Sequence, residues 1–100
     1  MALDYFTVTK TGIQLSTSAA SNGAALPLNS AGEVPRLIRI AASQPACIRI
    51  GSGAQTAIVT DLQVQPGDAV VITTNGCTNI AAIQVSAPGV VQISPLENNG

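Results

Sequence analysis

The carboxylates are the residues of this 100-residue chain that could perform acid–base chemistry. They are five in number: Asp4, Glu33, Asp61, Asp68 and Glu97. Asp61 and Asp68 can be considered as the carboxylate pair of a glycoside hydrolase. Asp68, however, directly follows Pro66-Gly67, where aspartate is ordinary turn chemistry, and aromatic platforms for a sugar are missing. The chain also has no histidine that could activate a serine or threonine. We therefore predict no catalytic residue and a protein that is not an enzyme.

Cys47 and Cys77 are the residues that could form a disulfide or bind a metal. They lie thirty positions apart, outside any CxxC motif, and no histidine completes a set of metal ligands. A reducing compartment favours free thiols, so we expect free cysteines rather than a disulfide. The chain contains neither a GxxxxGK(S/T) nor a GxGxxG motif. We expect no metal and no cofactor.

Arg39 and Arg49 form the one polar constellation that stands out. Each arginine stands between two isoleucines. A hairpin around 43–45 would place the two arginines directly opposite one another. Like charges across a strand pair are unfavourable, which points to a nearby carboxylate, either Asp61 or an acid of a partner. Two solvated arginines that splay apart are the alternative.

Charge is scarce along the whole chain. Charged residues make up 9%, where a typical soluble domain has roughly 25%. The four basic residues form no stripe that could neutralise phosphates, so we predict no nucleic-acid partner. No apolar run approaches the roughly 18 residues of a transmembrane helix, so we predict no membrane segment. Because charge opposes association, this surface favours a subunit of a larger assembly; an uncharged Ser/Thr-rich domain is the alternative.

The elements that must position these residues are short strands. Apolar residues alternate with polar ones in seven segments from about Val34 onward: 36–42, 46–50, 56–60, 62–64, 68–74, 79–86 and 90–96. Turn signals separate them, with a type II signature at Pro66-Gly67 and a hairpin signature at Asn75-Gly76. No segment shows helical periodicity. The sequence predicts an all-β fold, a small antiparallel β-sandwich or jelly-roll-like barrel.

Pairing between consecutive segments gives three specific expectations. A hairpin around 87–89 would place Gln84 opposite Gln92 on a polar face, with apolar residues opposite one another on the other face. A hairpin around 51–53 would place Ile48 opposite Ile58. A hairpin at Asn75-Gly76 would place Val71 opposite an isoleucine, but it leaves either a bulge or a strand that is apolar on both faces.

The first third of the chain has a different composition. Residues 4–10 alternate as a strand, and 12–17 could be its hairpin partner. Residues 16–33 are rich in Ser, Ala, Asn and Gly, with Leu26-Pro27-Leu28 as their apolar content. A connection this long without structure is uncommon in a compact domain, and it could reach on the order of 60 Å. We expect one domain overall, with strands and an extended arm or long loop in 1–33 and the sandwich core in 34–100.

Two stretches resemble small virion proteins of tailed bacteriophages. The first is RIAASQPACIRIGSG, residues 39–53, and the second is NIAAIQVSAPGVVQISPLE, residues 79–97. In those proteins an R-I-A strand is followed by a C-(Y/I)-(I/V)-R-(I/F)-G segment, a Pro-Gly turn and an A-x-I-x-V hairpin. The resemblance covers about residues 37–97 and leaves the N-terminal third unassigned.

The resemblance implies a capsid decoration, or cement, protein. Such proteins are small β-sandwiches, often trimers, that bind the shell and clamp neighbouring subunits of the major capsid protein. It further implies location on the capsid surface of a virion after synthesis in the host cytoplasm, in line with the lack of a signal peptide at the start of the sequence. The alternatives are a tail or fibre subunit, a head–tail adaptor, or a module that recognises a host surface.

These considerations select candidate interface residues. Aromatic residues contribute strongly to interfaces, although the aromatic pair here could equally belong to the core of the first strand. The candidates are Tyr5, Phe6, Leu26, Leu28, Arg39, Arg49 and Val71.

Overall fold

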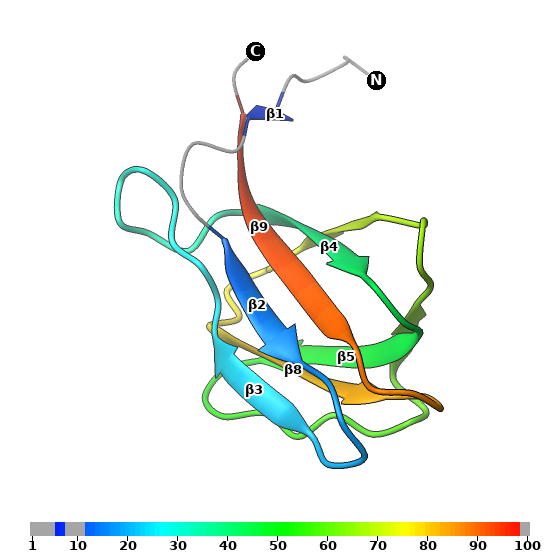
Figure 1. The fold of residues 1–100 in the computed structure, drawn as a ribbon. Helices are drawn as coiled ribbons and strands as arrows, with labels where there is room; N and C mark the ends of the chain where they lie inside the picture. The colour runs from blue at the N-terminus through cyan, green and yellow to red at the C-terminus, as the bar shows by residue number, and fades with distance from the viewer. Residues whose placement is uncertain (1–5, 8–11, 99–100) are drawn as a thin grey trace.

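The alternating aliphatic segments form two antiparallel sheets in the computed structural model, which describes residues 6–7 and 12–98 (Figure 1). Nine strands lie within these residues. They are β1 (Phe6–Thr7), β2 (Ile13–Ser16), β3 (Asn22–Ala25), β4 (Leu37–Ala42), β5 (Ala46–Gly51), β6 (Leu62–Val64), β7 (Val70–Thr73), β8 (Asn79–Gln84) and β9 (Val90–Asn98). The predicted all-β sandwich is confirmed, and its strands do not close into a barrel.

The strand order is that of a jelly roll. The first sheet runs β2–β9–β4–β7, with β1 beside β9 beyond the end of β2, and the second sheet runs β3–β8–β5–β6. Each strand from β2 to β5 pairs with its mirror image in the second half of the chain: β2 with β9, β3 with β8, β4 with β7 and β5 with β6. The pairs β4–β9 and β5–β8 then join these ribbons into two sheets. A ribbon of four strand pairs folded over itself in this way is the jelly-roll arrangement.

This topology corrects the predicted hairpins, because most consecutive strands belong to opposite sheets. Gln84 pairs with Ala46, and Gln92 pairs with Gln14 and Ala41, so the predicted ladder of the two glutamines is wrong. Alternation shows which side of a strand is buried, and that side faces inward in either sheet. It therefore does not select the partner strand.

The prediction that Arg39 lies opposite Arg49 is wrong for the same reason. Arg39 is on β4 in the first sheet, between Ser94 and Val71. Arg49 is on β5 in the second sheet. The sandwich core separates the two strands.

The turn signals are correct even where the pairing is not. At Pro66-Gly67 the N–H of Asp68 donates to the carbonyl of Gln65 at 3.1 Å, and Gly67 has φ 86°, as a type II turn requires. At Asn75-Gly76 the turn also forms, but β7 and β8 on either side of it enter different sheets. The strand β7 is apolar on both faces, which is one of the two predicted alternatives.

The core is aliphatic, as the composition predicts. Inward residues of both sheets interdigitate: Leu15, Leu26, Ile38, Ile40, Ala46, Ile48, Val64, Ile80, Ala82, Val91 and Ile93. The predicted strand 56–60 does not form, and Ile58 is exposed in the loop between β5 and β6 rather than opposite Ile48. Ile48 instead pairs with Ala82 and Leu62.

The N-terminal third contributes strands to both sheets. β2 pairs with β9 and not with β1, so the predicted hairpin of residues 4–10 with 12–17 is wrong. The expectation that 16–33 lacks secondary structure is also wrong, because β3 lies within it and pairs with β8. Leu26 follows β3, is 3% exposed, and its N–H donates to the carbonyl of Thr78 at 2.9 Å. Segment 16–33 is poor in large apolar residues because its strand, β3, lies at the edge of the second sheet and consists of Asn, Gly and Ala.

Candidate interaction surface

The two sheets differ in what covers their outer faces. The loop of residues 52–61, between β5 and β6, lies over the outer face of the second sheet. Cys47 points outward from β5 yet is only 1% exposed, and its thiol donates to the carbonyl of Val59 at 3.3 Å. The N–H of Ala57 donates to Ser21 Oγ at 2.8 Å, near the start of β3. This loop therefore buries side chains on a face that would otherwise be open.

Asp61 holds the loop in place. One of its carboxylate oxygens accepts hydrogen bonds from Arg49 Nε at 3.2 Å and from Arg49 Nη2 at 3.0 Å. The other accepts the N–H of Ile58 at 2.8 Å. The Ile58 N–H first, and the Arg49 guanidinium with it, hold the pKa of Asp61 below its ordinary value. Burial, assisted by the charge of Asp61, raises the pKa of the Cys47 thiol, which keeps it protonated at neutral pH.

The predicted carboxylate beside one of the two arginines is thus Asp61, which pairs with Arg49. The reason given for it is wrong, because no arginine lies opposite Arg49. Arg49 and Asp61 are twelve positions apart in the sequence, and they meet because the loop folds back over β5.

The turn that Asp61 closes presents apolar side chains to solvent. The N–H of Asp61 donates to the carbonyl of Ile58 at 3.0 Å, which completes a turn over 58–61. Val59 at its tip is 63% exposed, and Ile58 and Leu62 are also exposed. The hydrogen bonds of Asp61 hold these residues in a fixed arrangement, which we call the apolar turn (Ile58, Val59 and Leu62).

No loop of the described residues covers the outer face of the first sheet. We call it the open face and define it by the outward residues of β2, β9, β4 and β7. Three of their cross-strand rows cross both β9 and β4: Gln14–Gln92–Ala41, Ser94–Arg39–Val71 and Leu96–Leu37–Thr73. Val71 is 52% exposed, and Leu37, Ala41 and Leu96 are half-buried although nothing lies over them in the described part of the chain.

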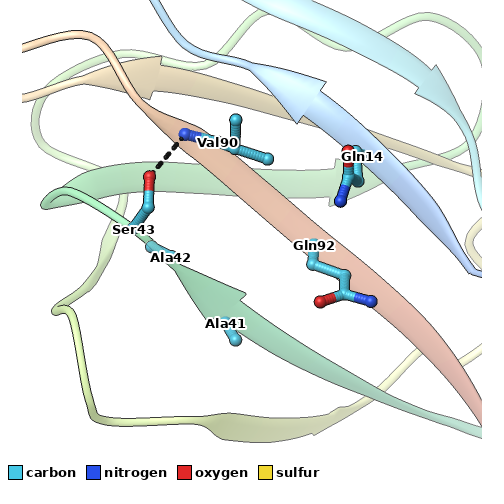
Figure 2. Close-up of a pocket in the computed structure, with 6 residues that line it drawn as sticks. All are labelled: Gln14, Ala41, Ala42, Ser43, Val90 and Gln92. Carbon is cyan, nitrogen blue, oxygen red and sulfur yellow. Dashed lines mark hydrogen bonds between the residues drawn. The ribbon is translucent and has the colours of Figure 1, made fainter.

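Two hydroxyl groups fix the end of the open face where β9 begins. Ser43 Oγ accepts the N–H of Val90 at 2.8 Å, and Thr17 Oγ1 accepts the N–H of Gly89 at 2.9 Å. The N–H of Ser43 and that of Thr17 donate in return to the carbonyls of Val90 and Gly89. Figure 2 shows the shallow depression beside this junction, where Gln14 and Gln92 stand above the small side chains of β4. Its floor is Ala41, Ala42, Ser43 and Val90.

The outward residues of the open face include few groups that can ionise. Arg39 is the single charged residue of the three rows, and the other members are amides, hydroxyls and aliphatic groups. Among the described residues no group of His, Cys, Asp or Glu is placed to hold a metal ion. Within the same residues no buried side-chain polar atom lacks a hydrogen bond. Cys47 and Cys77 are both free.

The structure brings together only part of the predicted interface. Arg39 and Val71 are cross-strand neighbours on the open face. Leu26 belongs to the core and offers no surface to a partner, whereas Leu28, after Pro27, is 46% exposed. Arg49 lies on the second sheet in its ion pair. Tyr5 lies outside the described residues, and Phe6 is in β1, where it pairs with Asn98.

Sequence reasoning missed Leu37 and Leu96 on the open face, and it assigned the apolar turn to a buried strand. The signal for the two leucines was their position next to the buried residues Ile38 and Pro95, which puts them on the opposite side of each strand. No local pattern distinguishes the apolar turn from a buried strand, because 56–60 has the composition of one.

Comparison with known proteins does not extend these observations. No protein-family model, curated protein or solved structure matches the chain. Among the described residues there is no helix with the length and apolar character needed to cross a membrane.

Proposed function

We propose that this chain is a structural subunit of a virus particle, a decoration or cement protein that binds subunits of the major capsid protein through its open face. The fold supports the proposal because jelly rolls occur among viral capsid proteins, lectins and cupins. The chain has no histidine of the kind that binds metal in many enzymes, and only two aromatic residues for stacking on a sugar. A scaffold that acts through contact fits this composition best.

The observation that carries the proposal is the difference between the two outer faces. Ten loop residues, 52–61, cover the outer face of the second sheet, whereas no described loop covers that of the first, where Val71 is exposed and Leu37 and Leu96 are half-buried. Both faces have few charged residues, and exposed apolar patches on a folded domain mark sites of interaction. A partner that covers the open face would bury outward side chains of the first sheet, as the loop of residues 52–61 does for the second.

The mechanism of a decoration protein is additive burial at many copies. Burial of apolar surface is worth roughly 25 cal/mol per Å², before the cost of association is subtracted. Contact through the open face of a single copy is therefore expected to give modest affinity. Attachment of an oligomer to several capsid subunits at once would raise the effective affinity without any new contact.

The test is binding to particles that lack this chain, assayed by co-sedimentation. Val71→Asp places a carboxylate on the open face, and Val59→Asp makes the same change at a similarly exposed valine on the apolar turn. We expect Val71→Asp to lose at least about tenfold in affinity, equal to about 1.4 kcal/mol, and Val59→Asp to bind like the unaltered chain. Circular dichroism of both variants controls for folding.

The reverse result would favour the second candidate, a tail, fibre or host-recognition module that binds through the apolar turn. That candidate is supported by the fixed arrangement of Ile58 and Val59, since a preordered apolar tip is what a recognition loop needs. Lack of binding by the unaltered chain to any such particle, together with its absence from purified virions by mass spectrometry, would refute both.

A further inference from the structure

We infer that Asn75 is a site of spontaneous chemical modification: the turn at Asn75-Gly76 converts to an aspartyl or isoaspartyl linkage, while the identical dipeptide Asn22-Gly23 is protected by the fold. The inference is independent of the proposed function. It rests on the different environments of two Asn-Gly pairs in one chain. A third pair, Asn99-Gly100, lies outside the described residues and serves as a reference.

The reaction needs only the chain and water. The main-chain nitrogen of Gly76 loses its proton to base and attacks Cγ of Asn75. The bond from Cγ to the side-chain nitrogen breaks, ammonia leaves, and a five-membered succinimide remains. Water then opens the ring at either of its two carbonyls, which gives aspartate or isoaspartate. One water is consumed, one ammonia is released, and nothing is oxidised or reduced.

The turn leaves the reacting groups of Asn75 and Gly76 accessible. Both residues are exposed, and a Cβ placed on Gly76 would have no neighbour within 4 Å, so the space for a ring is open. The side chain of Asn75 makes no hydrogen bond to the described residues. One hydrogen bond closes the turn, from the N–H of Cys77 to the carbonyl of Thr74 at 2.8 Å.

Local opening of the turn requires little disruption elsewhere. Thr74 is anchored by its hydroxyl, which donates to the carbonyl of Pro35 at 2.6 Å, and the N–H of Thr78 donates to the carbonyl of Gly51 at 2.9 Å. These anchors hold the chain on both sides while 75–77 move. Asn75 has φ 49° and Gly76 has φ 83°, the left-handed conformations of a type I′ turn, which this pair of residues adopts readily.

Asn22 and Gly23 are exposed as well, but hydrogen bonds and strand pairing restrain them. The side-chain nitrogen of Asn22 donates to the carbonyl of Ser16 at 3.0 Å. Asn22 lies in β3, paired with Ala82 in register, and Gly23 packs closely against the carbonyl of Ile80. The extended backbone of a ladder holds the Gly23 nitrogen away from the Asn22 side chain. Rotation into a reactive geometry requires β3 to leave β8, which would also expose the neighbouring core residue Leu26.

Conversion would have a measurable consequence for the whole chain. It adds one negative charge to a protein with a net charge of −1 and only five acids. The isoaspartyl product also lengthens the main chain by one carbon at the corner where the chain crosses from the first sheet to the second. A preparation should therefore resolve into charge variants as it ages.

The experiment uses the full folded chain, kept in mildly alkaline buffer and sampled over time. Trypsin separates Asn22, in 11–36, from Asn75, in 50–100, and fragment ions distinguish Asn75 from Asn99. We expect Asn75 to convert at least about tenfold faster than Asn22, which corresponds to about 1.4 kcal/mol between the two barriers. An Asn75→Asp variant should not form the acidic species that conversion of residue 75 produces in the unaltered chain as it ages.

Three outcomes would overturn the inference. The first is conversion of Asn22 as fast as Asn75 in the folded chain, and the second is failure of Asn75 to convert while Asn99 does so completely. The third comes from the same time course in denaturant, where the fold no longer protects either site. If the difference between Asn22 and Asn75 persists there, local sequence and not the structure is its cause.

Discussion

Replacement of Leu26 by alanine tests whether the N-terminal third is integral to the sandwich. Leu26 is 3% exposed and packs in the core, whereas Leu28, two residues further, is 46% exposed. Truncation of a buried leucine costs about 2–5 kcal/mol, from lost burial and from the cavity left behind. Truncation of the exposed leucine should change the free energy of unfolding by no more than about 0.5 kcal/mol. The pair Leu26→Ala and Leu28→Ala is therefore a matched comparison.

The magnitude is large relative to the stability of the domain. A domain of this size has a free energy of unfolding of about 5–15 kcal/mol. A loss of about 3 kcal/mol would lower the melting temperature by roughly 12–24 °C, since each kcal/mol shifts it by about 4–8 °C. Urea unfolding followed by far-ultraviolet circular dichroism measures this, because the chain has no tryptophan and a single tyrosine. The slope with urea should be the same for both variants.

The result that would refute the reasoning is equally specific. If Leu26→Ala costs less than about 1 kcal/mol, or no more than Leu28→Ala, then Leu26 is not a core residue. In that case β3 does not hold the edge of the second sheet in solution, and the segment 16–33 would regain its predicted role as an arm or loop.

Two further predictions concern the loop over the second sheet. The pKa of Asp61 is lowered in the folded state, so its contribution to stability is complete above its unfolded pKa of about 3.9 and is lost as the pH falls through the folded value. Asp61→Asn should therefore flatten the acid limb of a plot of unfolding midpoint against pH; an unchanged limb would contradict the assignment. Labelling with a thiol reagent should modify Cys77 well before Cys47, because Cys47 is buried beneath the loop with a raised pKa. The same Asp61→Asn change should speed labelling of Cys47, and equal rates for both thiols in the unaltered chain would count against the covered face.

The sequence predicts the class of this fold because strand alternation is a local property. Ile38, Ile40, Ile48 and Ile93 are inward in the structure, as their spacing indicates. Pairing is not local. A sandwich buries the same side of a strand whichever sheet it joins, so the pattern around Ile93 is compatible with β8 or β4 as its neighbour, and only the three-dimensional packing selects β4.

The candidate site was harder to predict for a related reason. Val71 could be identified because β7 is apolar on both sides. For Leu37 the signal was weaker: its position next to Ile38 places it on the outer side of β4, but Arg39 on the same side suggests that this side is solvated. The sequence does not predict that residues 52–61 cover Cys47, because this covering depends on the ion pair of Arg49 with Asp61. When a loop folds back over its own strand, its contacts leave no periodic pattern in the sequence, so they cannot be inferred from it.

The position of Arg39 bears on the kind of partner that we propose for the open face. Arg39 lies on the central strand β4, in the middle of the three rows, and none of the described residues in these rows is acidic. Two copies packed open face to open face about a twofold axis would bring this cation toward its own copy, and like charges buried together are costly. A partner surface with a carboxylate opposite Arg39 removes that cost.

This argues against a dimer through the open face and for a different protein as its partner. The trimer that the virion resemblance implies would then form through other surfaces, with head-to-tail contacts that do not oppose identical residues. Arg39→Glu decides between these arrangements. It should weaken binding to a partner with an acidic residue, whereas a face-to-face homodimer of the unaltered chain, detected by analytical ultracentrifugation, would be inconsistent with the argument.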